Sequence, residues 1–220
     1  MKTVVKGGQL ISGNDQYQAD ILIEGETIRA IGHGLEGDKV IDASGCLVFP
    51  GFIDGHTHLD MPVSGTVTSD NFASGSAAAL AGGTTMLIDF ATQDRGDTLA
   101  HALDVWHQRA DGNCSCDYGF HMAVTDWNAH TRAELHEMAA AGVTSFKCYY
   151  AYDALMVNDC EMYEILCEMK RIGGILGVHC ENGPVLDELR RNAVSEGHTG
   201  PEWHPKTRPS IIEGEAVGRF

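Results

Sequence analysis

Apolar and polar positions follow two different rhythms along the chain. Before residue 49 the apolar runs are short, and glycine or other turn formers interrupt each of them. Such runs predict β-strands joined by tight turns, including a turn at Gly7-Gly8. The expected strands cover residues 3–6, 10–11, 19–23, 27–31 and 39–41. We expect residues 1–48 to form a small all-β unit that needs strands from elsewhere to complete its core.

From residue 49 onward, β-rich runs alternate with helical patterns. The runs cover residues 49–53, 84–90, 118–124, 143–148 and 174–180. Leu99 and Trp106, between the second and third runs, fall at helical spacing. So do Met162 and Met169, between the fourth and fifth runs. A repeat of about 30 residues that alternates strand and helix predicts parallel strands with right-handed crossovers. We therefore expect an α/β fold with the first five β/α units of a TIM-type (β/α)8 barrel over residues 49–220.

A doubly wound sheet is the competing fold for this alternation. It is less favoured because no glycine-rich phosphate fingerprint follows the first strand.

Helix boundaries can also be predicted. Residues 131–134 and 158–161 have the sequence of capping boxes, which would each start a helix. Glycines within residues 81–84, 141–144 and 172–175 stand where a helix should stop before the next strand.

Composition excludes several function classes. The formal charge of −16 argues against nucleic acid and anionic membrane surfaces, because both would repel the chain. The seven cysteines are scattered and odd in number, and no charged-then-apolar leader opens the sequence. We expect free thiols in a reducing cytoplasm. No apolar run has the length needed to cross a bilayer.

The ends of the predicted strands collect the candidate chemistry. His56 and His58 follow the first strand, where alternation would place both imidazoles on one side, ready to share a metal ion. The alternative is one core histidine and one loop histidine. Lys147 and His179 end the fourth and fifth strands. Strand ends meet at one mouth of such a barrel, so we expect these four side chains to converge there.

The remaining polar groups at the strand ends have simpler expected roles. We expect Asp89 and Asp126 to accept hydrogen bonds from loop amides. His121 lies within the third strand and is expected to be a buried polar core residue. His33, His130, His198 and His204 fall in turns or polar stretches and suggest no special role.

Lys147 lies in an apolar strand, where a charged ammonium is costly. Burial would lower its pKa and leave a nucleophilic amine. The amine could form a Schiff base with a carbonyl substrate, or capture carbon dioxide as a carbamate that bridges two metal ions. It could also extend to the rim and pair with an acid. The nearby imidazoles favour the carbamate, since Schiff-base chemistry does not use them.

These residues resemble those of the cyclic amidohydrolases, and specifically the hydantoinase/dihydropyrimidinase family. The motifs that carry the resemblance are Phe49-Pro-Gly-Phe-Ile-Asp-Gly-His-Thr-His-Leu-Asp-Met-Pro62, the segments 40–46, 65–68 and 82–90, Lys147 with Ala151-Tyr152, Val178-His-Cys-Glu-Asn-Gly183, and residues 207–219. The His-x-His motif is shared by all amidohydrolases, whereas Leu-Asp-Met-Pro and the Lys-to-Tyr spacing narrow the resemblance to hydantoinases. The resemblance spans the whole chain and corresponds to the N-terminal half of such a protein.

The resemblance implies a site built on two divalent ions. His56 and His58 would bind one ion, His179 the second, and Lys147, as N6-carboxylysine, would bridge them. Zinc is the first choice, and manganese or cobalt would also suit these donors. Tyr152 would stabilise an oxyanion, although its sequence context also suits a packing aromatic. The positions that would line the pocket for the ring substituent are Met61, Val63, Tyr149 and Met156, for which ordinary loop packing is the alternative.

The implied reaction is hydrolysis of the cyclic amide of hydantoins or dihydropyrimidines to N-carbamoyl amino acids. A metal-bridging hydroxide would attack the ring carbonyl. The family also uses a fourth histidine and an aspartate, which would lie beyond Phe220, so we expect a truncated or partial form whose own activity is open. Full-length relatives suggest a homotetramer and β-strands that complete a composite β-sandwich with residues 1–48.

Four alternatives remain open at this stage. Allantoinase and dihydroorotase would share the metal centre, although apolar Met61 and Val63 argue against a charged ring such as dihydroorotate. A Schiff-base lyase would use Lys147 without metals. A non-catalytic assembly protein could be built on the same barrel, but relatives of that kind typically lack the metal ligands that are present here.

Overall fold

The computed structural model describes residues 1–63 and 65–220. Contacts divide the chain into two compact units. The first comprises Met1–Phe52 with Gly83–Thr85, and the second comprises Ile53–Gly82 with Met86–Phe220. We retain 1–48 and 49–220 as proposed domain limits.

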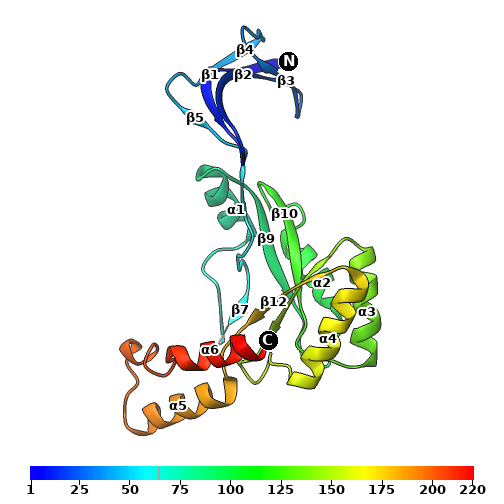
Figure 1. The fold of residues 1–220 in the computed structure, drawn as a ribbon, viewed down its shortest axis with the longest axis vertical. Coiled ribbons are helices and arrows are strands. Elements are labelled where there is room, and N and C mark those ends of the chain that lie inside the picture. Colours follow the sequence, from blue (N-terminus) through cyan, green and yellow to red (C-terminus); the bar gives the residue numbers. More distant parts are fainter. Residues whose placement is uncertain (64) are drawn as a thin grey trace. The chain divides into compact units, whose positions relative to one another are not determined.

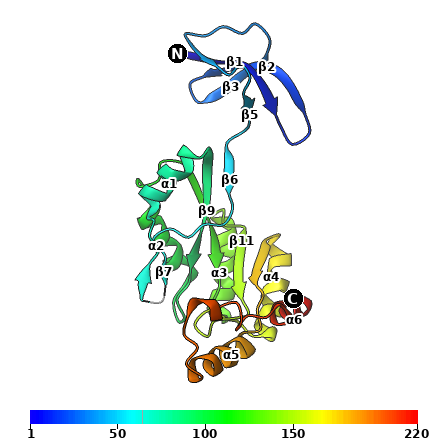
Figure 2. The same cartoon turned by 90° about the vertical axis from the view of Figure 1, so that its left-hand side faces the viewer.

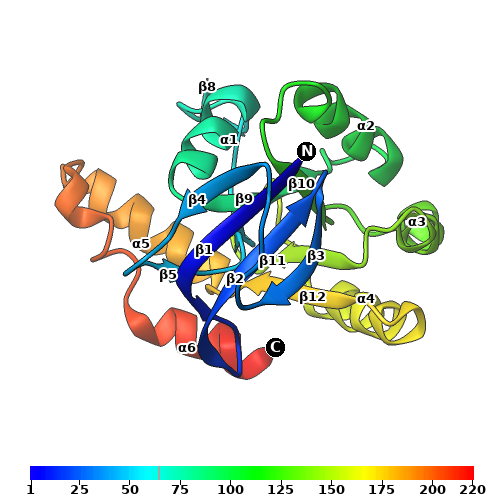
Figure 3. The same cartoon turned by 90° about the horizontal axis from the view of Figure 1, so that it is seen from above.

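The first unit is a five-stranded sheet. Its central strand β1 (Lys2–Ile11) lies between β2 and β4, as Figure 3 shows, in the order β3-β2-β1-β4, and β5 also pairs with β1. The antiparallel pairs are β1–β2 and β2–β3, whereas β4 and β5 run parallel to β1. The bounds of the other strands are Gln16–Glu24 for β2, Thr27–Gly32 for β3, Lys39–Asp42 for β4 and Leu47–Val48 for β5.

The prediction of a turn at Gly7-Gly8 was wrong. Strand β1 continues through both glycines, and a shift in its register with β2 lies between Val5 and Gly8. Gly7 has a φ of +75°, which a bulge accommodates without ending the strand. Gly8 is packed so closely that a Cβ atom would lie 2.6 Å from a methyl carbon of Val48. Gly7 and Gly8 therefore form part of a bulge inside one long strand.

The second unit confirms the predicted half barrel. Its main sheet has the order β12-β11-β10-β9-β6, and the pairs from β9 to β12 are parallel. The strands can be followed in Figures 1 and 2; their bounds are Phe52–Asp54 for β6, Thr84–Thr92 for β9, Asp117–Ala123 for β10, Ser145–Tyr149 for β11 and Ile175–His179 for β12. A separate small hairpin joins β7 (Pro62–Val63) to β8 (Thr66–Val67).

A helix follows each strand of this sheet. Neighbouring helices α1 to α4 contact one another and surround the strands from outside, as Figure 3 shows. The helical segments are Phe72–Ala81 for α1, Leu99–Ala110 for α2, Ala129–Ala140 for α3, Asp159–Ile172 for α4, Gly183–Ser195 for α5, the 3-10 turn Pro201–Trp203 for η1 and Ser210–Arg219 for α6. None of the helices in the described part of the chain is long and apolar enough to cross a bilayer.

The first predicted strand, 49–53, is shorter than expected. Strand β6 begins only at Phe52, because Pro50 has no amide hydrogen to donate to a ladder. At Gly51 the backbone approaches β9 so closely that a Cβ atom would lie 2.0 Å from the Thr85 hydroxyl. Phe52 and Ile53 are more than half exposed, although both side chains are apolar.

The two faces of the sheet have different roles. Alternate residues turn toward the helices and form one apolar cluster, in which Leu87 and Phe146 meet Leu99 and Ile165. Residues on the opposite face, such as Phe90 and Lys147, alternate with these core positions. The candidate site lies on this second face, at the carboxyl ends of the strands.

The predicted helix ends were confirmed, with one correction at a helix start. Asn158 and Glu161 form the expected reciprocal capping box, and α4 ends at Gly173 with a φ of +67°. Helix α3, however, starts at Ala129 and is capped by Asn128, whose side chain accepts from the Thr131 amide. The predicted capping box at 131–134 was therefore wrong. Glu134 instead turns inward and caps α2 by accepting from the Leu99 and Ala100 amides.

Candidate metal centre

His56 and His58 follow β6 on a segment that is anchored at every second residue. The three anchors are hydrogen bonds. The Gly55 carbonyl pairs with His121 Nε2 at 3.0 Å, and the Thr57 amide donates to the Ile88 carbonyl at 3.3 Å. The Leu59 amide donates to the Asp89 carboxylate at 2.7 Å. The histidines are the residues between these anchors, and their ring centroids lie 5.1 Å apart. The segment lies past the end of the strand, but its anchors impose the period that brings the two rings together.

The expected roles of the strand-end acids were confirmed. Asp89 is 1% exposed and accepts from the Leu59 and Phe90 amides and from Trp106 Nε1 at 3.2 Å. Asp126 accepts from the Gly96 amide at 3.0 Å. Both acids therefore hold neighbouring loops in place by accepting hydrogen bonds from their amides.

Three of the candidate donor side chains lie close to the ring of buried Phe90. Its ring centroid lies 4.6 Å from that of His56 and 4.9 Å from that of His58. Lys147 Nζ lies 5.9 Å from the same ring. These three side chains therefore lie near one another, as expected, but Lys147 stands inside β11 and not at its end.

Lys147 projects from the middle of β11 into this apolar surrounding. Burial lowers the pKa of its amine, and Tyr149 offers only a ring face, at 5.4 Å. Within the described residues, no carboxylate forms an ion pair with Lys147. The rim-pairing alternative is thus not what the structure shows. The amine has a raised neutral fraction, which reaction with carbon dioxide or a carbonyl group requires.

The pKa values of the two histidines are also lowered, which favours their neutral form. Burial lowers the pKa of His56, and the positive charge of Lys147 lowers it further. Burial likewise lowers the pKa of His58, although the Asp89 carboxylate opposes the change. Nδ1 of His58 is fully buried and has no hydrogen-bond partner among the described residues. A neutral imidazole with an unused lone pair is what a metal ion requires of a histidine.

His179 ends β12 on the far side of the same site. Its Nε2 lies 2.6 Å from a carboxylate oxygen of Glu181, so in the neutral ring Nε2 carries the proton and Nδ1 is left to bind. The Tyr152 ring lies 5.1 Å from the His179 ring and the Tyr149 ring 6.2 Å from it. Tyr152 has a φ of +71°, an unusual backbone conformation for a non-glycine residue.

Eight of the nine sequence-predicted site residues line one cavity of about 780 Å³. They are His56, His58, Met61, Val63, Lys147, Tyr149, Tyr152 and His179. Met156 is not among its walls; the Met156 carbonyl accepts from Arg95, and its side chain lies in a different hollow. Sequence reasoning missed His204, which also lines the cavity, because its polar surroundings in the sequence suggest an ordinary turn.

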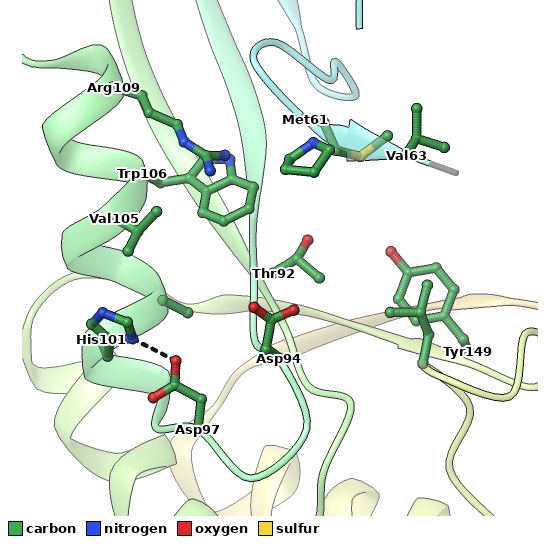
Figure 4. Close-up of a pocket in the computed structure, with 13 residues that line it drawn as sticks. Met61, Val63, Thr92, Asp94, Asp97, His101, Val105, Trp106, Arg109 and Tyr149 are labelled. Carbon is green, nitrogen blue, oxygen red and sulfur yellow. Dashed lines mark hydrogen bonds and ion pairs between the residues drawn. The ribbon is translucent and has the colours of Figure 1, made fainter. Parts of the chain in front are cut away.

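A second pocket of about 250 Å³ shares walls with this cavity (Figure 4). Met61, Val63 and Tyr149 belong to both, and Trp106 of α2 closes the far side beneath the Arg109 guanidinium. Asp94 faces into the space. The sequence placed Trp106 at helical spacing from Leu99, and nothing in it marked Trp106 as a pocket wall.

The donors fit a metal only if Lys147 takes part. In residues 1–63 and 65–220, no three His, Cys, Asp or Glu side chains converge closely enough to hold an ion. The histidine pair offers two neutral nitrogens, and a carboxylated Lys147 would add oxygens beside them. The orphaned Nδ1 of buried His58 fits the same interpretation.

Comparison with known proteins identifies the class. Residues 47–206 match the family model described as the amidohydrolase family. The chain belongs to that family, and membership implies dependence on a metal in general.

The relatives narrow the assignment. The chain is 45% identical to a D-hydantoinase of Geobacillus stearothermophilus and 40% identical to a dihydropyrimidinase of Rattus norvegicus. These alignments cover 100% and 99% of the chain but 47% and 44% of the relatives. A crystal structure of D-hydantoinase superposes with a TM-score of 0.97 at 43% identity, over 100% of this chain and 48% of that one. The chain is a member of the hydantoinase/dihydropyrimidinase family and spans about half the length of the curated relatives it matches.

Proposed function

We propose that this chain supplies the His56, His58, Lys147 and His179 half of the active site of a cyclic amidohydrolase. The substrates would be hydantoins or dihydropyrimidines, and the products N-carbamoyl amino acids. The observation that carries the proposal is the convergence on one cavity of His56, His58 and Lys147, whose pKa values are all lowered.

Lys147 would become a bridging ligand by a simple addition. Its neutral Nζ would attack carbon dioxide, form a C–N bond and release one proton, giving a carbamate with two oxygens. The lowered pKa supports this step, because only the unprotonated amine reacts. The imidazoles of His56 and His58 would complete one ion's donor set, and Nδ1 of His179 would serve the other. Zinc suits these donors best, and manganese or cobalt would also fit.

The metal ions, when bound, would supply Lewis acidity and a water of lowered pKa. Water adds to the ring carbonyl, the ring C–N bond breaks, and the leaving nitrogen takes up a proton. Tyr152 borders the cavity beside His179, where its phenol could donate to the oxyanion that develops on the carbonyl oxygen.

The cavity walls support a preference for uncharged rings. Met61 and Val63 present apolar surface, and Tyr149 adds an aromatic face. These three side chains would pack against the substituent of the ring. We propose that Met156 acts less directly, through the loop that carries Tyr152.

A side-by-side hydrolysis assay tests this function. The intact protein should open dihydrouracil and an aryl hydantoin, and should act poorly on allantoin and dihydroorotate, because the last carries a charge that the apolar walls cannot pair. His58→Ala should abolish every activity. Hydrolysis of allantoin alone, or borohydride trapping of a substrate on Lys147, would contradict the proposal in favour of an allantoinase or a Schiff-base lyase.

A further inference from the structure

Two charged side chains beside the proposed centre have no part in the function described so far. Glu181 follows His179 by two residues, and its side chain is only 13% exposed. One of its oxygens lies 2.6 Å from His179 Nε2. The other lies 3.6 Å from Nε of Arg208, which belongs to the segment between η1 and α6. His179, Glu181 and Arg208 thus form a connected row.

The chemistry of the row selects one form of the His179 ring. A carboxylate can only accept hydrogen bonds, so Nε2 must carry the hydrogen. A neutral imidazole has a single N–H, and Nδ1 is therefore left with its lone pair. Without Glu181 nothing in this row would hold the proton at Nε2, and the ring could also turn about its bond to Cβ. Carboxylates that accept from a ligating histidine set its tautomer and orientation in this way.

Arg208 links this row to the cavity wall. Its Nη1 lies 3.4 Å from the carbonyl oxygen of His204, and the His204 side chain lines the cavity. The guanidinium therefore contacts both Glu181 and the segment that contributes His204 to the cavity wall. Displacement of that segment would alter the support of Glu181.

We infer that Glu181, braced by Arg208, is a positioning residue that fixes His179 as the Nε2–H tautomer with Nδ1 directed to the metal. This inference rests on the proposed function only in taking His179 as a ligand. It assigns no further ligand and no role in the bond-breaking steps.

The tautomer can be read directly in the metal-free intact protein. Nitrogen-15 NMR of labelled histidines, with His179→Asn to assign the signal, should show His179 protonated at Nε2. Glu181→Ala should move His179 to a mixture of tautomers, whereas Glu181→Gln should preserve the Nε2–H form, because the amide oxygen still accepts. Glu196→Ala is the matched control, since Glu196 pairs with His198 at 3.7 Å and neither residue lines the cavity.

Metal affinity gives the second measurement. In chelator competition, Glu181→Ala should weaken one bound ion roughly 10- to 100-fold and leave the other unchanged. Arg208→Met should weaken the same ion less, and it should add little to Glu181→Ala in the double variant. Unchanged tautomer and unchanged affinity in Glu181→Ala would overturn the inference.

The two proposals can fail separately. The tautomer is measured without metal and without substrate. A protein that hydrolyses no cyclic amide but shows the Glu181-dependent tautomer would contradict the proposed reaction and support the positioning role. Normal hydrolysis by Glu181→Ala with a wild-type tautomer would contradict the positioning role and support the proposed reaction.

Discussion

Burial sets the chemical state of the donors at the scale of single residues. His56, His58 and Lys147 each have a lowered pKa, and burial is the first cause in every case. The same environment would be costly for three cations, so burial beside Phe90 raises the neutral fraction of each group. Neutral nitrogen is what both metal binding and carbamate formation require.

Tyr152 is the residue whose role can be isolated most cleanly. Tyr152→Phe removes only the phenol oxygen, and kcat should fall by about 10²- to 10³-fold, the usual cost of losing one oxyanion donor. Metal content should be unchanged, because no ligand is altered. Tyr163→Phe on α4, where the side chain is 69% exposed, is the control. A loss in kcat smaller than tenfold would assign Tyr152 to packing.

Asp20 gives a pH-dependent prediction in the first unit. The Gly7 amide holds the pKa of Asp20 below its usual value, the Leu35 amide assists, and burial opposes them. A lowered folded-state pKa contributes stability above the unfolded value of 3.8, which is lost as the pH falls through the folded value. The free energy of unfolding in urea, measured from pH 5 to 2.5, should therefore fall less steeply with decreasing pH in Asp20→Asn than in the wild type. Exposed Asp15→Asn is the control. A fall as steep as that of the wild type in Asp20→Asn would contradict the assignment.

Loops that connect strands to helices hold the site together at the scale of elements. The loop after β9 reaches the loop after β11 through Arg95, which donates to the carbonyls of Ala154 (3.2 Å) and Met156 (2.7 Å). The Tyr152 carbonyl accepts from the Leu155 and Met156 amides. Because Tyr152 has a positive φ, its position depends on this surrounding support.

Loss of Arg95 should therefore disturb catalysis without disturbing the metal. We expect Arg95→Met to lower kcat by about 10- to 100-fold through misplacement of Tyr152, with metal content unchanged. Arg191→Met removes an exposed guanidinium that pairs with Glu188 at 2.6 Å and should leave kcat as it was. Wild-type turnover in Arg95→Met would show that the loop keeps its shape without the clamp.

Elements were predictable where local pattern decides them, and not where distant contacts do. The strands from β9 to β12 and the cap at Asn158 carry their signals within a few residues. The box at 131–134 misled because Glu134 is used by α2, more than 30 residues away in sequence. Similarly, the bulge at Gly7 is stabilised by an acid on β2, which no local reading of β1 reveals.

At the scale of the whole molecule, parallel topology explains why sequence-distant residues could be grouped in advance. Strand ends of a parallel sheet meet at one edge, so His58, Lys147 and His179 could be assigned to one place without contact information. His204 as a wall of the cavity and Trp106 as a wall of the second pocket could not, because they depend on how the segment before α6 and α2 pack in the fold. The same limit applies to Met156, which lines a different pocket.

The first unit shows apolar surface of the kind expected for an incomplete β-unit. Ile28, Ile31, Val40 and Ile41 are between 43% and 58% exposed. The second unit shows the same on Ile175 of β12, at 73%. These faces agree with a chain that spans about half the length of its relatives.

Metal analysis of the intact protein and of Lys147→Ala tests the central claim most directly. The wild-type protein should contain about two divalent ions per chain, as bridged two-metal sites do. Lys147→Ala should lose the bridge, with less than one ion retained and no hydrolysis, while Lys170→Ala on α4 should behave as wild type. Two ions retained by Lys147→Ala would contradict the account.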